Sequence, residues 1–211
     1  MVSCEVKICG VTSVEDALDC VRAGADAIGV NFWTVTSRYC HEDTARSIVQ
    51  AIGDDALVIG VFVDATVEHI RAVREYTGIG WVQLHGMESV DEVHALLPKA
   101  YKALAVSDAN VIDQARNYPG EHVLLDTYVP GIPGGTGQTF NWDIARVLAK
   151  ERKLTLAGGL TPQNVAQAVR HVRPFRVDVA SGVESSPGKK DPRLVQEFIR
   201  AVRAVEAYDP F

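Results

Sequence analysis

Residues 123–142 read VLLDTYVPGIPGGTGQTFNW, and they contain one complete passage from a strand through a loop to a helix. The apolar run VLL predicts a short buried strand that ends on the carboxylate of Asp126, and a helix is expected to begin near Asn141. No side chain larger than threonine occurs at Gly134, Gly135, Thr136 and Gly137. We therefore expect the backbone N–H groups of this part of the loop to be accessible to a phosphate or another ligand. A flexible connector beside an exposed aspartate is the alternative interpretation.

The same alternation of a short apolar run and an amphipathic helix continues on both sides of this stretch. Strands are expected within residues 5–10, 23–33, 57–63, 81–86, 101–106, 123–126, 153–160 and 175–182. Strands that are mostly apolar on both faces, each followed by a helix, indicate a parallel sheet covered by helices. Eight such units in 211 residues predict an α/β protein with a single (β/α)₈ TIM barrel. A doubly wound sheet is the alternative, but no Gly-x-Gly-x-x-Gly motif follows the first strand.

Polar residues mark where several of the helices are expected to begin. Thr12 or Ser13 is expected to cap the first helix, and Asp108 the helix that runs to about Asn117. Thr161-Pro162 fits the N-cap and first helical position of a later helix, and the last helix is expected from about Asp191.

The composition is that of an ordinary globular chain, with 47% hydrophobic and 23% charged residues. A net charge of −6 without a basic stripe argues against a nucleic-acid or anionic-membrane partner. No apolar run is long enough to span a bilayer, and no secretory leader is evident, which predicts a cytoplasmic protein. The four cysteines form no CxxC pair and are expected to be reduced. Because no linker divides the chain, residues 1–211 are expected to form one domain.

In a barrel of this kind the reactive side chains lie at the C-terminal ends of the strands and in the loops that follow. The residues expected at those ends are Cys9, Arg38, Asp64, Gln83, His85, Asp126, Gly158, Gly159, Asp178, Ser181 and Gly182. The glycine-bearing turns LAGGL and ASGVE follow the last two strands, where barrels bind phosphate on backbone N–H groups. A tight turn without a ligand is the alternative for Gly158 and Gly159.

Individual residues and motifs allow more than one interpretation. Cys9 is either a small core residue or, at a strand end, a proton acceptor. His85 points into the mouth of the barrel or caps its own turn, whereas the other histidines are expected to be solvated. No metal-ligand spacing such as HExxH is present, so no metal is expected. The GGTGQT segment lacks the lysine of a nucleotide P-loop, and no Gly-x-Ser-x-Gly elbow indicates acyl transfer.

Taken together, the motifs resemble those of the phosphoribosylanthranilate isomerase family. They are VKICGVT, GADAIGVNFW…SRY, IGVFVD, VQLHG, LLDT…GGTGQTFNW, LAGGL and DVASGVE…PGKKD, from about residue 6 to residue 191 in the family's order. The resemblance implies a (β/α)₈ barrel that performs an Amadori rearrangement of N-(5-phosphoribosyl)anthranilate in tryptophan biosynthesis, without a cofactor. It also implies a small phosphorylated substrate as the only partner and a monomer or homodimer.

The resemblance further implies roles for individual residues. Cys9 in KICG matches the general base and Asp126 in LLDT the general acid, while Arg38 in SRY matches the residue that pairs with the anthranilate carboxylate. Gln83, His85 and Asp178 match positions that line the pocket. The phosphate motifs correspond to Gly158, Gly159, Ser181 and Gly182, and the active-site loop to Gly134, Gly135, Thr136 and Gly137.

One segment departs from the family. Where the family usually reads close to YPKSPRY, this chain reads WTVTSRY over residues 33–39. Loss of both prolines predicts a more flexible loop before Arg38. Three alternatives remain open at this stage: another phosphosugar barrel such as an epimerase, a barrel that binds a phosphorylated ligand without turnover, and a bifunctional isomerase that also acts in histidine synthesis. The last would have an acid in place of Cys9.

Overall fold

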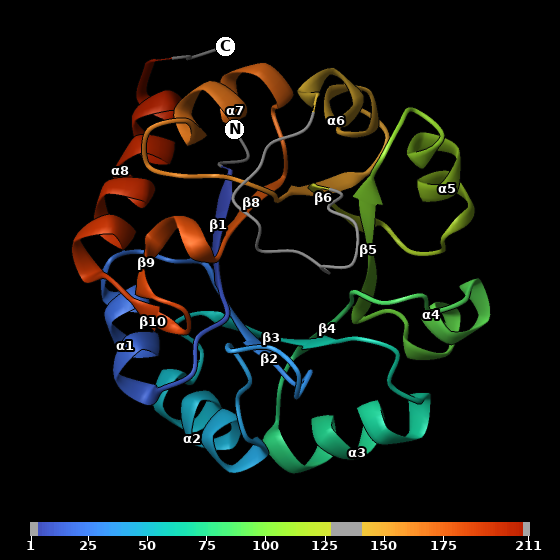
Figure 1. Cartoon of the computed structure of the whole chain (residues 1–211), viewed down its shortest axis with the longest axis vertical. Helices are drawn as coiled ribbons and strands as arrows, with labels where there is room; N and C mark the ends of the chain where they lie inside the picture. The colour runs from blue at the N-terminus through green and yellow to red at the C-terminus, as the bar shows by residue number, and fades with distance from the viewer. Residues whose placement is uncertain (1–3, 128–140, 209–211) are drawn as a thin grey trace.

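The computed structural model describes residues 4–127 and 141–208, with side chains to residue 205. Eight strands form a closed parallel barrel in the order β1 to β8, and the helices surround it on the outside (Figure 1). The predicted (β/α)₈ barrel is therefore confirmed. In the described part of the chain, no helix is long and apolar enough to cross a membrane.

The strands follow the expected apolar runs closely. They are β1 (Glu5–Cys9), β2 (Ala27–Asn31), β3 (Leu57–Phe62), β4 (Trp81–Leu84), β5 (Ala100–Val106), β6 (His122–Thr127), β7 (Lys153–Leu156) and β8 (Arg176–Val179). The helices are α1 (Val14–Arg22), α2 (Glu42–Ile52), α3 (Val67–Thr77), α4 (Val90–Leu96), α5 (Val111–Asn117), α6 (Trp142–Leu148), α7 (Val165–Val172) and α8 (Pro192–Tyr208). After β8 come the short 3-10 helix η1 (Ser181–Val183) and the hairpin of β9 (Glu184–Ser186) and β10 (Lys189–Lys190).

Side chains alternate between the two faces of each strand, and this produces two separate hydrophobic cores. The larger core lies between the barrel and the helices, and it includes Val6, Ile8 and Ile28 at 0% exposure. The smaller core fills the barrel interior and consists of Ala27, Ile59, Tyr101, Ala103, Leu124 and Ala157. Lys7, Gln83 and Asp178 are also buried on strands of the barrel. This placement of polar groups inside the barrel provides the floor of a site at the C-terminal ends of the strands.

Two of the predicted helix starts are wrong by a few residues. Asp108 does not cap α5; its carboxylate accepts a hydrogen bond from the N–H of Asn110, which occupies the N-cap position. Similarly, α7 begins after Asn164 rather than at Thr161-Pro162, because the Asn164 side chain accepts from the Thr161 N–H and closes a turn there. Ser13 is confirmed as the cap of α1, and α8 begins directly after Asp191.

The N-terminal end of the barrel is filled by an aromatic cluster around His122. Its ring lies 4.9 Å from that of Trp81 and 5.2 Å from that of Phe175, both edge to face. Among the described residues its buried Nδ1 has no hydrogen-bond partner, and burial together with Arg176 lowers its pKa to about 4. His122 is therefore half-buried, not fully solvated as expected, since the aromatic neighbours remove part of its ring from water.

Candidate active site

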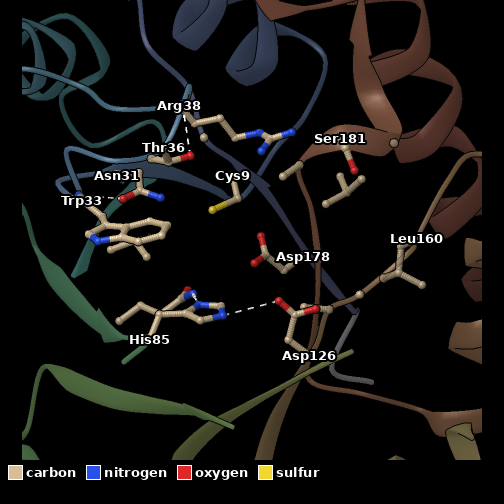
Figure 2. Close-up of a pocket in the computed structure, with 18 of the residues that line it drawn as sticks. Cys9, Asn31, Trp33, Thr36, Arg38, His85, Asp126, Leu160, Asp178 and Ser181 are labelled. Carbon is tan, nitrogen blue, oxygen red and sulfur yellow. Dashed lines mark hydrogen bonds and ion pairs between the residues drawn. The ribbon is translucent and has the colours of Figure 1, made fainter. Parts of the chain in front are cut away.

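A cavity of about 360 Å³ opens at the C-terminal ends of the strands, within the size range of small-molecule sites. The described site residues predicted from sequence, apart from Asp64, all line it: Cys9, Arg38, Gln83, His85, Asp126, Gly158, Gly159, Asp178, Ser181 and Gly182. Figure 2 shows Cys9 and Asp126 on different sides of this cavity, with the Asp178 carboxylate between them. The barrel thus brings together side chains that are up to 173 positions apart in the sequence, from Cys9 to Gly182.

Cys9 ends β1 and lies beside a buried ion pair. Lys7, two residues earlier on the same face of the strand, is 0% exposed and donates to both carboxylate oxygens of Asp178 at 3.1 Å. Burial and the Asp178 charge raise the pKa of the Cys9 thiol, whereas the Lys7 ammonium and Lys190 act in the opposite direction. Ionisation of the thiol therefore depends on the balance between burial and Asp178 on one side and the nearby cations on the other.

Asp126 ends β6 and is linked to His85 on the loop after β4. One carboxylate oxygen accepts from the Thr127 N–H at 2.7 Å, and the other lies 3.4 Å from Nε2 of His85. Nδ1 of His85 lies 2.8 Å from the amide nitrogen of Gln83. Because Lys7 and Tyr101 both donate to Oε1 of Gln83, that amide nitrogen is the donor toward Nδ1, so the neutral His85 ring carries its proton on Nε2, facing Asp126.

The guanidinium of Arg38 is held by two hydrogen bonds to Glu184. Nε and Nη2 donate to the two carboxylate oxygens at 2.9 and 2.8 Å. Lys190 also donates to Glu184, at 2.8 Å, and to the Cys9 carbonyl at 2.6 Å. Gly10 (φ +73°) makes room for the Arg38 stem, since a Cβ there would lie 2.6 Å from Cδ of Arg38. Groups at the end of β1 and on β9 and β10 thus fix the Arg38 guanidinium at the rim.

The segment before Arg38 lacks the prolines of the family but is organised by side-chain hydrogen bonds. Asn31 accepts from the N–H of Trp33 at 2.9 Å, and Thr36 accepts from the N–H of Arg38 at 3.3 Å. Tyr39 then pairs with Asn31 in an isolated bridge. These hydrogen bonds close local turns, which restrict the backbone where the family has proline rings. Greater flexibility of this loop stays a prediction.

The turns after β7 and β8 form one continuous cradle. Gly158 and Gly159 have φ of +89° and +62°, a pair of left-handed residues that orients successive amides. A Cβ on Gly182 would overlap the carbonyl oxygen of Leu160, so the two turns are in direct contact. Ser181 begins η1 on the same side of the cavity (Figure 2). This cradle supplies backbone donors with little side-chain bulk, as phosphate sites of barrels do.

Asp64 does not line the cavity, although sequence predicted it at a strand end. Its φ is +52°, and its carboxylate accepts from the N–H of Met87, so it orders the loop after β4 instead. The predicted active-site loop, Gly134, Gly135, Thr136 and Gly137, lies outside the described residues. Sequence reasoning missed Asn31 and Trp33, which line the cavity, and the signal for both was their position at the end of the second strand.

Comparisons with known proteins agree over nearly the whole chain. The family model described as N-(5'phosphoribosyl)anthranilate (PRA) isomerase matches residues 6–201. This chain belongs to the PRA isomerase family. The N-(5'-phosphoribosyl)anthranilate isomerase of Trichlorobacter lovleyi is 44% identical over 197 residues, covering 93% of this chain and 96% of that protein. The protein of the same name from Thermotoga neapolitana is 43% identical over 203 residues, covering 95% and 98%.

Solved PRA isomerases have the same fold. The crystal structure of the Thermotoga maritima phosphoribosyl anthranilate isomerase superposes with a TM-score of 0.88 at 40% identity, covering 95% of this chain and 99% of that one. A further structure (TM-score 0.84, 37% identity, 95% and 99% covered) is a PRA isomerase in complex with reduced 1-(o-carboxyphenylamino)-1-deoxyribulose 5-phosphate. The chain is accordingly an isomerase with the (β/α)₈ fold of this family.

Proposed function

We propose that this chain isomerises N-(5-phosphoribosyl)anthranilate to 1-(2-carboxyphenylamino)-1-deoxyribulose 5-phosphate in tryptophan biosynthesis. The observation that carries the proposal is the joint presence, around one cavity, of a thiol on β1, a carboxylate on β6, an arginine at the rim and a glycine cradle after β7 and β8. Family membership supports the same reaction.

The rearrangement requires one acid and one base on different parts of the substrate. Asp126 donates a proton to the ribose ring oxygen, the C1–O bond breaks, and an iminium forms at C1. Cys9, as the thiolate, removes the proton from C2, which gives an enolamine and a neutral thiol. The enolamine then tautomerises: a proton adds at C1 and the proton of the C2 hydroxyl is lost, which yields the C2 ketone. The proton taken by Cys9 balances the one given by Asp126, and the reaction is redox-neutral without a cofactor. The separation of Cys9 and Asp126 in Figure 2 suits attack on two sites of one sugar.

The two ends of the substrate carry anions, and the cavity offers a site for each. Arg38 pairs with the anthranilate carboxylate; among the described residues its Nη1 has no hydrogen-bond partner, while Glu184 holds the other side of the guanidinium. Gly158, Gly159, Ser181 and Gly182 bind the phosphate through backbone N–H groups. The sugar between these two sites is lined by Gln83, His85 and Asp178.

Turnover of freshly prepared phosphoribosylanthranilate tests this proposal. Purified protein should remove anthranilate-type fluorescence much faster than the spontaneous background, and the product should show a ketone at C2 by ¹³C NMR. A phosphosugar-binding barrel of different specificity would bind inorganic phosphate without this turnover.

The protein is proposed to act in the cytoplasm as a monomer or homodimer. One related structure is of monomers generated from the dimeric isomerase of Thermotoga maritima.

A further inference from the structure

Lys7 is a buried cation directly beneath the mouth of the cavity. It is 0% exposed, so no water shields its charge, and it is absent from the cavity lining. Its ammonium donates to Gln83 Oε1 at 3.0 Å and to both carboxylate oxygens of Asp178 at 3.1 Å. The thiol of Cys9 is a further close neighbour of the same ammonium.

The position of Gly29 shows how close the ammonium and the thiol lie. Gly29 pairs with Cys9 in the parallel ladder of β1 and β2. A Cβ on Gly29 would lie 2.7 Å from Sγ of Cys9 and 3.0 Å from Nζ of Lys7. Both atoms therefore occupy the space that a side chain at residue 29 would fill. Glycine at this position lets the cation and the sulfur approach each other.

Charges of both signs surround Cys9. The groups that face it from the elements packed against β1 are Lys7 itself, Asp178 on β8, Lys190 on β10, Arg38 in the loop after β2 and Tyr101 on β5. His85 and Asp126 line the same cavity, and Glu184 pairs with Arg38 and Lys190. Among these groups, Lys7 and Lys190 lower the pKa of the Cys9 thiol, whereas Asp178 raises it. Lys7 is the cation with the largest effect on the thiol.

We propose that Lys7 is a positioning residue that favours the thiolate form of Cys9, with Asp178 and Gln83 fixing the ammonium beside the sulfur. The proposal deepens the proposed function, on which the identity of Cys9 as the base rests. Burial alone makes the thiolate a strong base but leaves little of the thiol ionised. Lys7 increases the ionised fraction without touching the substrate, in exchange for part of that basicity.

A purely structural role for Lys7 is the competing interpretation, because the pair of Lys7 and Asp178 joins β1 to β8. The chain offers a matched control in Lys102. It is also a buried lysine (3% exposed), paired with Glu88 at 3.2 Å, and it binds the carbonyls of Leu84 and Gly86 outside the cavity lining. Both Lys→Met variants remove a buried ammonium, but only one removes it from Cys9.

The test is the pH dependence of alkylation of Cys9 by iodoacetamide, followed by mass spectrometry of the Cys9 peptide in the absence of substrate. Lys7→Met should raise the alkylation midpoint by about one pH unit or more, which leaves roughly tenfold less thiolate at neutral pH. Lys102→Met should leave the midpoint unchanged. Equal midpoints in wild type and Lys7→Met would overturn the proposal, as would equal shifts in the two Lys→Met variants.

A second variant covers the case in which Lys7→Met does not fold, since it leaves the Asp178 charge buried and unpaired. In Lys7→Met/Asp178→Asn the pair is neutral, and its alkylation midpoint should lie above that of Asp178→Asn alone. Equal midpoints for these two variants would contradict the proposal.

Kinetics separate this inference from the proposed function. In Lys7→Met, kcat for phosphoribosylanthranilate should fall while KM changes little, and the acidic limb of the pH profile should move with the alkylation midpoint. If wild type has no turnover but the midpoint still shifts, the proposed function fails and the Lys7 inference stands.

Discussion

Arg38 and Glu184 form a two-point ion pair across the rim of the barrel, although 146 positions separate them in the sequence. Nε and Nη2 of Arg38 lie 2.9 and 2.8 Å from the two carboxylate oxygens, and Glu184 is anchored in turn by Lys190. Burial raises the pKa of Glu184, but Arg38 and Lys190 outweigh it and hold that pKa below its usual value. The Glu184 carboxylate is therefore charged, and it holds the Arg38 guanidinium through Nε and Nη2.

Glu184→Gln tests this relationship, because it removes the charge and keeps the size of the side chain. KM for phosphoribosylanthranilate should rise about tenfold, equivalent to about 1.4 kcal/mol of binding, while kcat changes little. Glu151→Gln is the matched control, since Glu151 makes the same two-point contact with Arg116 on the protein surface, away from the cavity. Steady-state kinetics of both variants measure the effect; a fall in kcat at constant KM would contradict it.

Asp126→Asn should lower kcat by about 10²-fold or more, because a carboxamide cannot deliver the proton that opens the ribose ring. The fold should persist, since the amide oxygen still accepts from the Thr127 N–H. Asp64→Asn is the control: this carboxylate also follows a barrel strand but lies outside the cavity lining. Circular dichroism and turnover are measured together, and near-normal turnover of Asp126→Asn would exclude it as the acid.

Gly158→Ala should displace both Asp126, the proposed acid, and the phosphate cradle. A Cβ there would lie 2.6 Å from the Thr127 nitrogen and 2.8 Å from Oδ1 of Asp126. Gly53→Ala is the matched control, because Gly53 also has positive φ (+56°) but nothing lies within 4 Å of its Cβ position. Both variants should lose about 1 kcal/mol of stability or more from backbone strain. Only Gly158→Ala should also lose inhibition by inorganic phosphate; retention of that inhibition would argue against the cradle.

The half-buried His122 predicts a loss of stability in mild acid. Its pKa is lowered to about 4 in the folded protein, so the unfolded chain takes up this proton first as the pH falls. Stability should decline from about pH 6.5, the ordinary histidine pKa, toward about pH 4. In His122→Phe this part of the decline should be smaller, whereas His94→Gln, which changes an exposed histidine, should behave as wild type. Thermal melts across this pH range measure both, and parallel curves for wild type and His122→Phe would refute the assignment.

The barrel and its strand ends were predictable because both depend on local patterns. Each apolar run is short and is followed by an amphipathic helix, and parallel strands necessarily bring Cys9 and Asp126 to the same end. The predicted starts of α5 and α7 were wrong because short turns closed by side chains compete with the helix at Asn110 and Asn164. Such turns involve only two or three neighbouring residues and leave little trace in the apolar pattern.

Long-range ion pairs were not predictable from the sequence alone. Lys7 and Asp178 are 171 positions apart, and Lys7 in an apolar strand reads as a residue on a solvated face. Glu184 stood within the SGVE motif, but only the fold shows that it holds Arg38. His122 was misjudged because its aromatic neighbours come from three other segments of the chain.

Turnover of phosphoribosylanthranilate by wild type beside Cys9→Ala tests the central claim most directly. Loss of anthranilate-type fluorescence should far exceed the spontaneous rate with wild type and return to that rate with Cys9→Ala, while both proteins keep the same circular dichroism. Equal turnover by the two proteins would contradict the role of Cys9 as the base. No turnover by either would contradict the proposed reaction itself.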